Sequence, residues 1–356
     1  MEKTVVDLAS FVVEELERLT GEFGMKDLVG PPEKLSGGYS SVNYKVVAEK
    51  GNSQALLRIA VGLPESVAER QALVLRAAAR MGVQCPRTQM TPTGKYVLSC
   101  TTSSGQQAFA TMLEFVHGST ANKLTSTDEA GMLRHLGTLL ATLHSGRQPC
   151  EDLGLHDISS DMYLQCFMHW PPGMTWSEGL METTKVAEDD HDIVRFLKPR
   201  VEGHLNALLV PELPRGLLHG DPFLDNMMVG DSGATLLDWD EAAHGPFVYD
   251  LACAIVGGCF DGEGNIIDLR LNALLDAYHA IRPLSQMERK SLPSLMKTNA
   301  LLVAWYRWRN FHIDVVDSPP DAKESFREML RVHRTLENTA TLDMLNGKLS
   351  ALESIM

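Results

Sequence analysis

One stretch of the chain carries three polar residues whose types and spacing suit phosphoryl transfer. Residues 217–240 contain a His-Gly-Asp sequence ending at Asp221, an asparagine five positions later, Asn226, and an aspartate after an apolar run, Asp238. Mg²⁺ prefers hard oxygen ligands, and an Asn–Asp pair supplies them while leaving positions for a triphosphate and water. The third carboxylate, on Asp221, can accept the proton of an attacking hydroxyl or hold that hydroxyl in line.

A β-hairpin would bring these side chains together. Two apolar runs, 227–229 and 234–237, are typical of strands, and the turn sequence Gly230-Asp-Ser-Gly233 separates them. Pairing of the strands would place Asn226 beside Asp238, with the His-Gly-Asp aspartate on the loop before them. An isolated aspartate on a loop usually stabilises a turn, so the chemical interpretation depends on the complete set.

The order of these segments resembles the aminoglycoside phosphotransferase and choline kinase superfamily, whose members have a protein-kinase-like fold and phosphorylate small molecules. The matching segments are His-Gly-Asp-x-x-x-x-Asn at 219–226, Asp-Trp-Asp at 238–240 and Gly-Pro-x-x-Tyr-Asp-Leu-Ala at 245–252. The first two stand where protein kinases carry His-Arg-Asp and Asp-Phe-Gly. The resemblance spans roughly residues 34–310 and is more specific for the reaction than for the substrate.

The resemblance implies ATP as the phosphoryl donor and Mg²⁺ as the cofactor. It implies Asp221 as the catalytic base, and Asn226 and Asp238 as Mg²⁺ ligands. It also implies an α+β, bilobal protein-kinase-like fold, with a small antiparallel-sheet N-lobe carrying one helix and a mainly helical C-lobe. Asp250 and His144 are expected to be structural, His144 because a histidine at a helix C-terminus interacts favourably with the helix dipole.

A glycine-rich turn near residue 38 is predicted to clamp the nucleotide. Gly37 and Gly38 would let the backbone approach the phosphates, and Ser40 and Ser41 would donate hydrogen bonds to them. Without other motifs a Gly-Gly sequence indicates no more than a hairpin. The superfamily often has Asn at the position of Ser41, so the chain departs from the pattern there.

Arg58 lies on a strand at the position where protein kinases place their phosphate-binding lysine. An arginine is permanently charged and can bind α- and β-phosphate oxygens. Glu69, on the following helix, is the expected partner of Arg58, as in the Lys–Glu ion pair of kinases, and Glu65 is the reserve candidate. The alternative is that Arg58 is a solvent-facing strand residue.

The run from Met112 to Gly118 resembles the hinge between the lobes. The adenine edge would bond to backbone groups near Glu114 and Val116. The predicted lobes are therefore 1–117, including an N-terminal helix, and 118–356, with the catalytic loop, the metal site and the acceptor pocket. The choice between ATP and GTP depends on hinge geometry that the sequence does not define.

Hydrophobic periodicity supports this division into a β-rich part and a helical part. The expected strands are 44–47, 55–59, 96–98 and 111–116, and the expected helices are 4–20, 66–81, the segment after a capping box at 126–129, 190–209, 247–258, 266–281 and 286–312. Residues 150–190 are expected to be an insertion with loops that shapes a substrate pocket.

The acceptor site is expected beside the metal site. Asp240 and Glu241 follow the metal aspartate, and Trp305 and Arg307 lie on a helix of the kind that often walls the acceptor pocket. Trp305 is equally compatible with core packing. The overall layout is most similar to the homoserine-kinase-like and hydroxylysine-kinase-like branches, so an amino acid or amino alcohol with a free hydroxyl is the leading acceptor. Choline or ethanolamine comes next, followed by an aminoglycoside or sugar.

Composition argues against other classes of partner. The net charge is −14, from 46 acidic and 32 basic residues, and no Lys/Arg cluster stands out, so neither nucleic acid nor an anionic membrane is an expected partner. No apolar run approaches the ~18 residues that a membrane span needs. Asp7 and Glu14 interrupt the N-terminal apolar pattern, so no signal peptide is expected and the expected address is cytoplasmic. The oligomeric state is left open.

Two other functions fit parts of the pattern. A nucleotide-binding regulator without catalysis would explain arginine at 58 and serine at 41, but the complete set of Asp221, Asn226 and Asp238 argues against it. A protein kinase would need an activation segment ending in Ala-Pro-Glu, whereas here the 245–252 segment leads straight into a helix.

Overall fold

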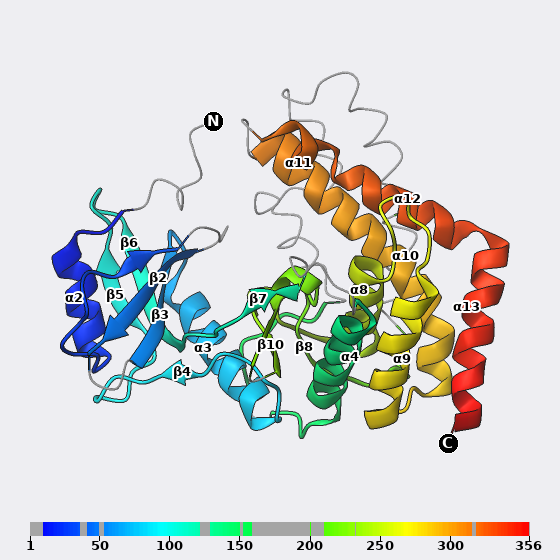
Figure 1. Cartoon of the computed structure of the whole chain (residues 1–356), viewed down its shortest axis with the longest axis horizontal. Coiled ribbons are helices and arrows are strands. Elements are labelled where there is room, and N and C mark those ends of the chain that lie inside the picture. Colours follow the sequence, from blue (N-terminus) through cyan, green and yellow to red (C-terminus); the bar gives the residue numbers. More distant parts are fainter. Residues whose placement is uncertain are drawn as a thin grey trace.

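The computed structural model of the chain describes residues 10–35, 41–49, 53–121, 129–149, 152–158, 200, 210–231, 233–314 and 318–355. An antiparallel sheet flanked by helices forms the N-terminal part, and the C-terminal part is mainly helical (Figure 1). The predicted α+β architecture is confirmed.

The strands of the N-lobe form one antiparallel sheet in the order β1-β2-β3-β6-β4, with β5 paired to the first half of β6. Their bounds are β1 Glu33–Lys34, β2 Ser41–Ala48, β3 Ser53–Val61, β4 Thr88–Gln89, β5 Leu98–Thr101 and β6 Gln107–Glu114. Two expected strands are displaced: the 96–98 run starts its strand only at Leu98, and the 111–116 strand begins four residues earlier and ends at Glu114. The side chains 108–113 of β6 are all buried. The strand therefore lacks the alternation of apolar and polar residues from which the bounds of a strand can be predicted.

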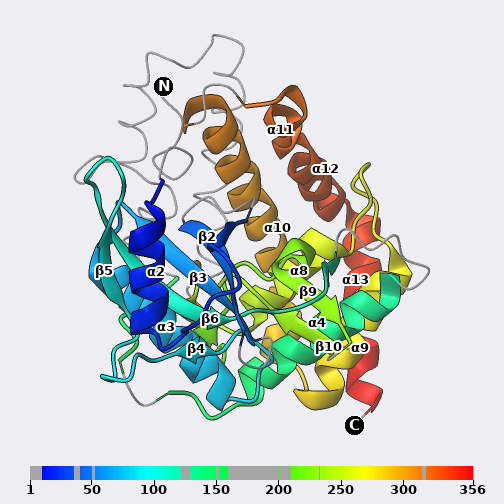
Figure 2. The same cartoon turned by 60° about the vertical axis from the view of Figure 1, so that its left-hand side comes forward.

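Helices cover both faces of this sheet. The first, α2 (Val13–Glu22), buries Leu19 in the core formed with β2 and β3, and α3 (Glu65–Arg80) packs Leu75 near Leu113 on the other side (Figures 1 and 2). The expected helix at 4–20 is thus observed from Val13, and its first part lies outside the described residues.

The helices of the C-lobe pack together around one large apolar core. Its helices are α4 Glu129–Ser145, α8 Val248–Gly258, α9 Asp268–Ile281, α10 Gln286–Arg309, α11 Pro320–Glu324, α12 Phe326–Glu337 and α13 Thr339–Ala351. A capping box of Ser285 and Glu288 starts α10. The helices expected at 247–258, 266–281 and 286–312 are confirmed within three residues. The capping box at 126–129, the helix at 190–209 and the insertion at 150–190 fall largely or wholly outside the described residues.

Two small sheets, one of three strands and one of two, lie between the large sheet and the helices. They are β7 (Ser119–Thr120), β9 (Met227–Gly230) and β10 (Gly233–Leu236) in the order β10-β9-β7, and β8 (Arg215–Leu218) with β11 (Ala243–Pro246). Because β7 follows the predicted hinge and pairs with β9, the chain joins the C-lobe directly after residue 118. This pairing supports the predicted lobe boundary, which stays a prediction.

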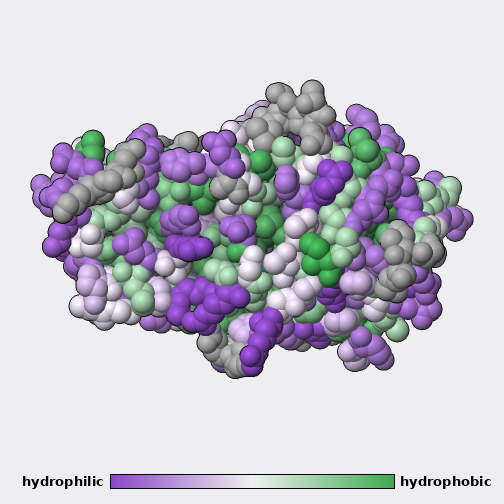
Figure 3. All heavy atoms as spheres, turned by 60° about the horizontal axis from the view of Figure 1, so that its bottom comes forward, coloured by the Kyte–Doolittle hydropathy of each residue, from purple (hydrophilic) through white to green (hydrophobic). Residues whose placement is uncertain are grey.

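Polar and charged residues are prominent on the face of the molecule that Figure 3 shows, and apolar residues lie there in small, separated areas. None of the helices that the structure describes is both long and apolar enough to span a membrane.

Candidate active site

The loop that carries Asp221 leaves β8 through a glycine in a left-handed conformation. Gly220 has φ +88°, and a Cβ built there would lie 2.0 Å from the carbonyl oxygen of Glu241. Only glycine allows the backbone to turn this way at such close range. Residues 219–226, called here the catalytic loop, are therefore pressed against the turn that holds Glu241.

Asn226 orients the Asp221 carboxylate. Its side-chain nitrogen Nδ2 donates to the Asp221 carbonyl oxygen at 2.9 Å and to the carboxylate oxygen Oδ2 at 2.8 Å. The amide oxygen of Asn226 takes part in neither of these hydrogen bonds and could coordinate a cation. The structure thus brings the predicted base and one predicted metal ligand into direct contact.

The predicted hairpin is confirmed, and it places the second predicted metal ligand beside the first. β9 and β10 pair in register, and the backbone N–H of Leu237 donates to the carbonyl oxygen of Asn226 at 2.7 Å. The next residue, Asp238, has φ +50°, an uncommon conformation for a residue with a side chain, and its carboxylate is 52% exposed. The partly exposed side chain of Asp238 therefore starts one residue after the backbone contact with Asn226.

An amide oxygen and an exposed carboxylate suit Mg²⁺ that also binds phosphate oxygens and water. Across the described part of the chain, no group of three or more His, Cys, Asp and Glu side chains forms a protein-only metal site. Two protein donors, Asn226 and Asp238, would leave positions on an ion for phosphate oxygens and water. Their roles as ligands stay a prediction.

The catalytic loop has a second contact with the Asp238 turn through His219. This buried ring donates from Nε2 to the carbonyl oxygen of Leu237 at 2.7 Å and packs edge-on against Trp239, with ring centroids 4.7 Å apart. Its Nδ1 accepts the backbone N–H of Asp221 at 3.3 Å. Burial lowers the pKa of His219, which matches a neutral ring with one donor and one acceptor.

The Asp221 carboxyl group has a pKa close to neutrality. Removal of water by the surrounding protein is the largest cause, and together with the carboxylates of Glu241, Asp225 and Asp238 it raises the pKa of Asp221 to about 7. The hydrogen bond from Asn226 opposes this change by lowering the pKa. A base whose pKa lies near the working pH is well suited to proton transfer.

Glu241 shares this environment. Its side chain reaches solvent, yet the surrounding protein raises its pKa to about 7, with Asp240 and Asp238 adding to the rise and Arg70 opposing it. Asp221, Asp238 and Glu241 thus repel one another electrostatically. Cations are favoured in this part of the molecule.

Arg58 points across to the same turn, but its partner differs from the predicted one. Its Nη2 donates to Oδ2 of Asp240, and its Nη1 lies 3.7 Å from Oδ1 of Asp238. Glu69, the expected partner, is exposed, and its pairing with Arg58 stays a prediction. The residue of α3 that faces this point is Gln71, whose Nε2 donates to Oδ1 of Asp240 at 2.7 Å.

The sequence carried a signal for this difference. Ala68, Ala72 and Leu75 form the buried stripe of α3. Gln71 lies next to this stripe, three residues after Ala68, whereas Glu69 falls outside it. The placement of Asp240 against Arg58, by contrast, joins residues 182 positions apart and has no local signal.

Asp250 anchors the catalytic loop from below. Its carboxylate accepts the backbone N–H of His219 at 2.7 Å and that of Gly220 at 3.0 Å, and its side chain is fully buried. His144, at the end of α4, approaches the same carboxylate with Nε2 at 3.2 Å. The expected structural roles of Asp250 and His144 are therefore specific: together they fix the backbone immediately before Asp221.

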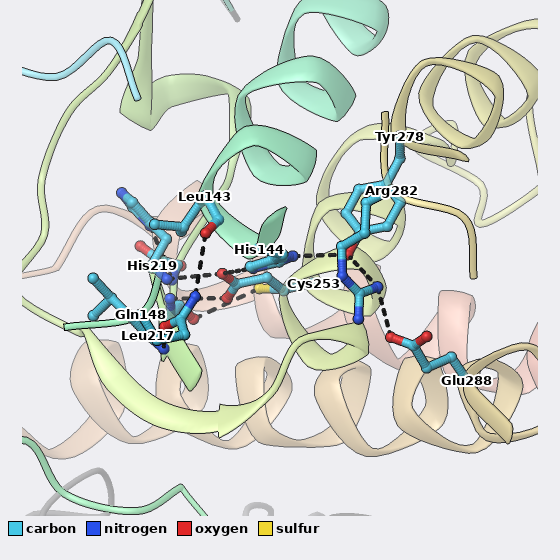
Figure 4. A network of polar contacts seen from close by, with 12 residues as sticks. Leu143, His144, Gln148, Leu217, His219, Cys253, Tyr278, Arg282 and Glu288 are labelled. Atoms are coloured by element: carbon cyan, nitrogen blue, oxygen red, sulfur yellow. Dashed lines mark hydrogen bonds and ion pairs between the residues drawn. The ribbon is translucent and has the colours of Figure 1, made fainter. Parts of the chain in front are cut away.

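A buried polar chain continues from this anchor. Nδ1 of His144 lies 2.8 Å from the hydroxyl of Tyr278, which also accepts a hydrogen bond from Arg282 at 3.1 Å, and Arg282 pairs with Glu288 at 2.7 Å. Figure 4 shows His144 between His219 on one side and Tyr278 with Arg282 on the other. Sequence reasoning missed Tyr278 and Arg282, which have no motif and come from α9 and its C-cap.

The predicted nucleotide residues are placed in part. Gly37, Gly38 and Ser40 lie outside the described residues, and Ser41 is a buried residue that opens β2. Glu114 ends β6, where its N–H donates to the carbonyl oxygen of Arg87 at 2.8 Å. Val116 lies in the segment between β6 and β7. Their roles toward the nucleotide stay predictions.

The predicted acceptor residues on α10 have other contacts. Trp305 is fully buried and packs on Trp308 with ring centroids 5.2 Å apart, as expected of an ordinary core residue. Arg307 pairs with Glu328 at 2.8 Å. These contacts do not support a role for Trp305 and Arg307 in the acceptor site.

Residues 32–284, more than half of the chain, match the sequence profile of the phosphotransferase enzyme family, APH. The chain belongs to this family. Among the relatives of this phosphotransferase, the homoserine kinase of Agrobacterium fabrum is 27% identical over 316 residues, which cover 85% of this chain and 91% of the relative. The predicted family and the predicted class, a small-molecule phosphotransferase, are confirmed.

Solved structures show how the phosphotransferase folds. A microcompartment-associated aminopropanol kinase has a TM-score of 0.66 at 18% identity, covering 94% of this chain and 99% of that chain. An amicoumacin kinase in complex with AMP-PNP, Ca²⁺ and Ami has a TM-score of 0.65 at 14% identity, covering 93% and 90%. Identities this low show a shared fold, and the predicted bilobal protein-kinase-like fold is confirmed.

Proposed function

We propose that this phosphotransferase transfers the γ-phosphate of Mg-ATP to the hydroxyl of a small amino acid or amino alcohol. The observation that carries the proposal is the contact of the Asp221 carboxylate with Asn226, directly beside the exposed carboxylate of Asp238. This contact brings the proposed base and the proposed metal ligands together on the catalytic loop and the turn that follows β10. Because ATP is a cytoplasmic substrate, the expected compartment is the cytoplasm.

Asp221 would accept the proton of the acceptor hydroxyl. Its carboxylate is held by Asn226, and its pKa of about 7 keeps a large fraction of it deprotonated at neutral pH. Asn226 and Asp238 would hold Mg²⁺, which neutralises charge on the phosphate oxygens when bound. The chain itself then contributes position and proton acceptance.

Arg58 and the hinge would hold the nucleotide. The guanidinium of Arg58 lies beside Asp238, so phosphates bound at the metal would come within its reach. The N–H of Glu114 is already bonded to Arg87. The carbonyl of Glu114 and the N–H of Val116 are therefore the hinge groups we assign to adenine. Ser41 and the turn before it would cover the phosphates.

The acceptor should carry a positive charge. The carboxylates of Glu241 and Asp225 lie close enough to the proposed base, Asp221, to raise its pKa, so the site is rich in negative charge. An ammonium group is attracted to such a site. The homoserine kinase relative and the aminopropanol kinase neighbour are both named for hydroxylated amines. Of the predicted acceptor residues, Glu241 is the one this proposal retains.

An ADP-release assay with Mg-ATP and a panel of acceptors tests the proposal. The panel would hold homoserine, hydroxylysine, aminopropanol, choline, ethanolamine, methylthioribose, several sugars and kanamycin, with Asp221→Ala as the blank. We expect the largest ADP release with homoserine or a related amino alcohol. Turnover of choline or ethanolamine alone would favour the quaternary-amine alternative. ATP binding with silence across the panel would favour a non-catalytic regulator.

A further inference from the structure

The guanidinium of Arg58 lies in a largely buried position where its charge needs a counter-ion. The side chain is 15% exposed, and a buried cation needs an anionic partner and satisfied hydrogen bonds. The residue of α3 that faces it, Gln71, is neutral, and Glu69 is exposed. The carboxylate that contacts Arg58 belongs to Asp240, outside the N-lobe.

We infer that Asp240 is the positioning residue for Arg58, supplied by the C-lobe in place of the helix glutamate that kinases use. Its Oδ2 accepts from Arg58 Nη2, and its Oδ1 accepts from Gln71 Nε2 at 2.7 Å. The carboxylate is 18% exposed, so both partners hold it in a site largely shielded from water. This inference rests on the proposed function, because it assigns Arg58 to the nucleotide.

The two ends of the guanidinium group have different tasks. Nη2 is tied to Asp240, while Nη1 lies 3.7 Å from Oδ1 of the predicted metal ligand Asp238. A planar guanidinium can make both contacts at once, with one side anchored and the other presented to the metal and phosphates. A lysine ammonium, as a single point charge, is less able to serve two fixed partners.

The contact crosses between the lobes. Arg58 belongs to β3 and Gln71 to α3, whereas Asp240 lies on the turn between β10 and β11. Figure 1 shows α3 at the junction of the N-lobe sheet and the C-lobe. The N-lobe cation is thus oriented correctly only when the lobes are closed on one another. In the Lys–Glu arrangement of kinases both partners belong to the N-lobe.

The predicted acceptor role of Asp240 is replaced by this assignment. Both carboxylate oxygens already accept hydrogen bonds from protein side chains. The competing role is a second metal ligand, since Asp240 lies two residues from Asp238. The two roles differ in what their loss would change: a metal ligand sets the Mg²⁺ requirement, and a positioning residue sets the ATP affinity through Arg58.

Asp240→Asn, Arg58→Met, the double variant and wild type make the test. We expect Asp240→Asn to weaken ATP binding, measured calorimetrically without acceptor, by ~10-fold to 30-fold, with a matching rise of the KM for ATP. The double variant should bind ATP no more weakly than Arg58→Met, because the positioning acts through Arg58. The half-saturating Mg²⁺ concentration at fixed ATP should stay within about twofold of wild type.

Two further variants sharpen the result. Gln71→Leu, which removes the second hydrogen bond of Asp240, should weaken ATP binding by about threefold. Glu129→Gln breaks another Arg–carboxylate pair, with Arg270 at 2.7 Å, outside the site, and should leave ATP binding unchanged. Melting curves of all variants check that each is folded.

Several outcomes would overturn the inference. One is a large rise in the Mg²⁺ requirement of Asp240→Asn with ATP affinity otherwise normal. Others are losses that multiply in the double variant, or a loss in Glu69→Gln as large as that in Asp240→Asn. If wild type bound ATP and Asp240→Asn bound it equally well, the inference alone would fall. If wild type bound no nucleotide, the proposed function would fall with it.

Discussion

The side-chain nitrogen Nδ2 of Asn226 donates a hydrogen bond to carboxylate oxygen Oδ2 of Asp221 across 2.8 Å. The same nitrogen also holds the Asp221 carbonyl oxygen, so one amide fixes both the backbone and the side chain of the proposed base. Asn226 thereby connects the proposed base to the proposed metal site, because its amide oxygen lies on the side of the group opposite to Nδ2.

Asp221→Asn should abolish most of the turnover while nucleotide binding persists. Loss of a general base costs about 10²-fold to 10⁴-fold in rate, and the asparagine keeps the size of the side chain. We expect kcat to fall in this range, with ATP affinity within a few-fold of wild type. Steady-state kinetics and calorimetry measure the two quantities. Turnover within a few-fold of wild type would exclude Asp221 as the base.

The reaction should slow at acidic pH. The base must be deprotonated, and the surrounding protein raises the pKa of Asp221 to about 7, so kcat/KM should rise through neutral pH and level off above it. Asp225→Asn removes a charge that raises this pKa. The midpoint of the rise should therefore move to lower pH in that variant. An unmoved midpoint would show that Asp225 does not act on Asp221.

The free energy of unfolding should depend on the same titration, but here the protonated form of Asp221 is the favourable one. The pKa of Asp221 is raised from 3.8 to about 7, so the folded protein binds this proton more tightly than the unfolded chain. Its favourable contribution is complete below pH 3.8 and is lost as pH rises through about 7. In the absence of ligands, Asp221→Asn should melt at a higher temperature than wild type at about pH 8. Thermal scans at several pH values should show this gain shrinking toward about pH 5.

Removing the anchor below the catalytic loop should affect catalysis from a distance. In Asp250→Asn an NH₂ group replaces one acceptor oxygen and faces the backbone N–H of His219 or Gly220. We expect at least a ~100-fold loss of kcat, because small displacements of catalytic groups have effects of this size. Kinetics and thermal unfolding measure the change. Asp276→Asn, at an exposed position of α9, is the matched control and should behave like wild type.

Tyr278→Phe tests how far this anchor extends. The change leaves Nδ1 of His144 and the guanidinium of Arg282 without the hydroxyl between them. Unsatisfied buried polar groups cost about 1–3 kcal/mol each, so the melting temperature should fall. Activity should fall less than in Asp250→Asn. Equal losses of activity in both variants would mean that the chain acts as one unit.

Gly220→Ala should disrupt the site through a backbone clash. The new Cβ would lie 2.0 Å from the carbonyl oxygen of Glu241, and the residue has φ +88°. Gly94 has nearly the same φ, +85°, with nothing within 4 Å of its built Cβ. Gly94→Ala should therefore cost only the ~1–2 kcal/mol of a left-handed alanine, whereas Gly220→Ala should lose activity as well. Chemical denaturation and the ADP assay compare the two, and equal behaviour would contradict the close approach.

The sequence alone predicted that the proposed metal ligands and the proposed base lie together, because they are neighbours along the chain. Asn226 and Asp238 flank one hairpin, and the glycines and turn residues between its strands fix the pairing locally. Asp221 precedes the hairpin by a few residues, so the spacing of the motif already sets the geometry. The β-rich N-lobe and the helical C-lobe were predictable for a similar reason, because short strands and amphipathic helices have local hydrophobic patterns.

Tertiary structure decided the partners that lie far apart in sequence. The Arg58–Asp240 contact spans 182 positions and the His144–Tyr278 contact spans 134, and neither has a local pattern. Analogy supplied Glu69 for Arg58, but the packing of α3 turns that residue to solvent and brings neutral Gln71 to the site. A largely buried cation without a carboxylate partner is costly, and the fold supplies that partner as Asp240.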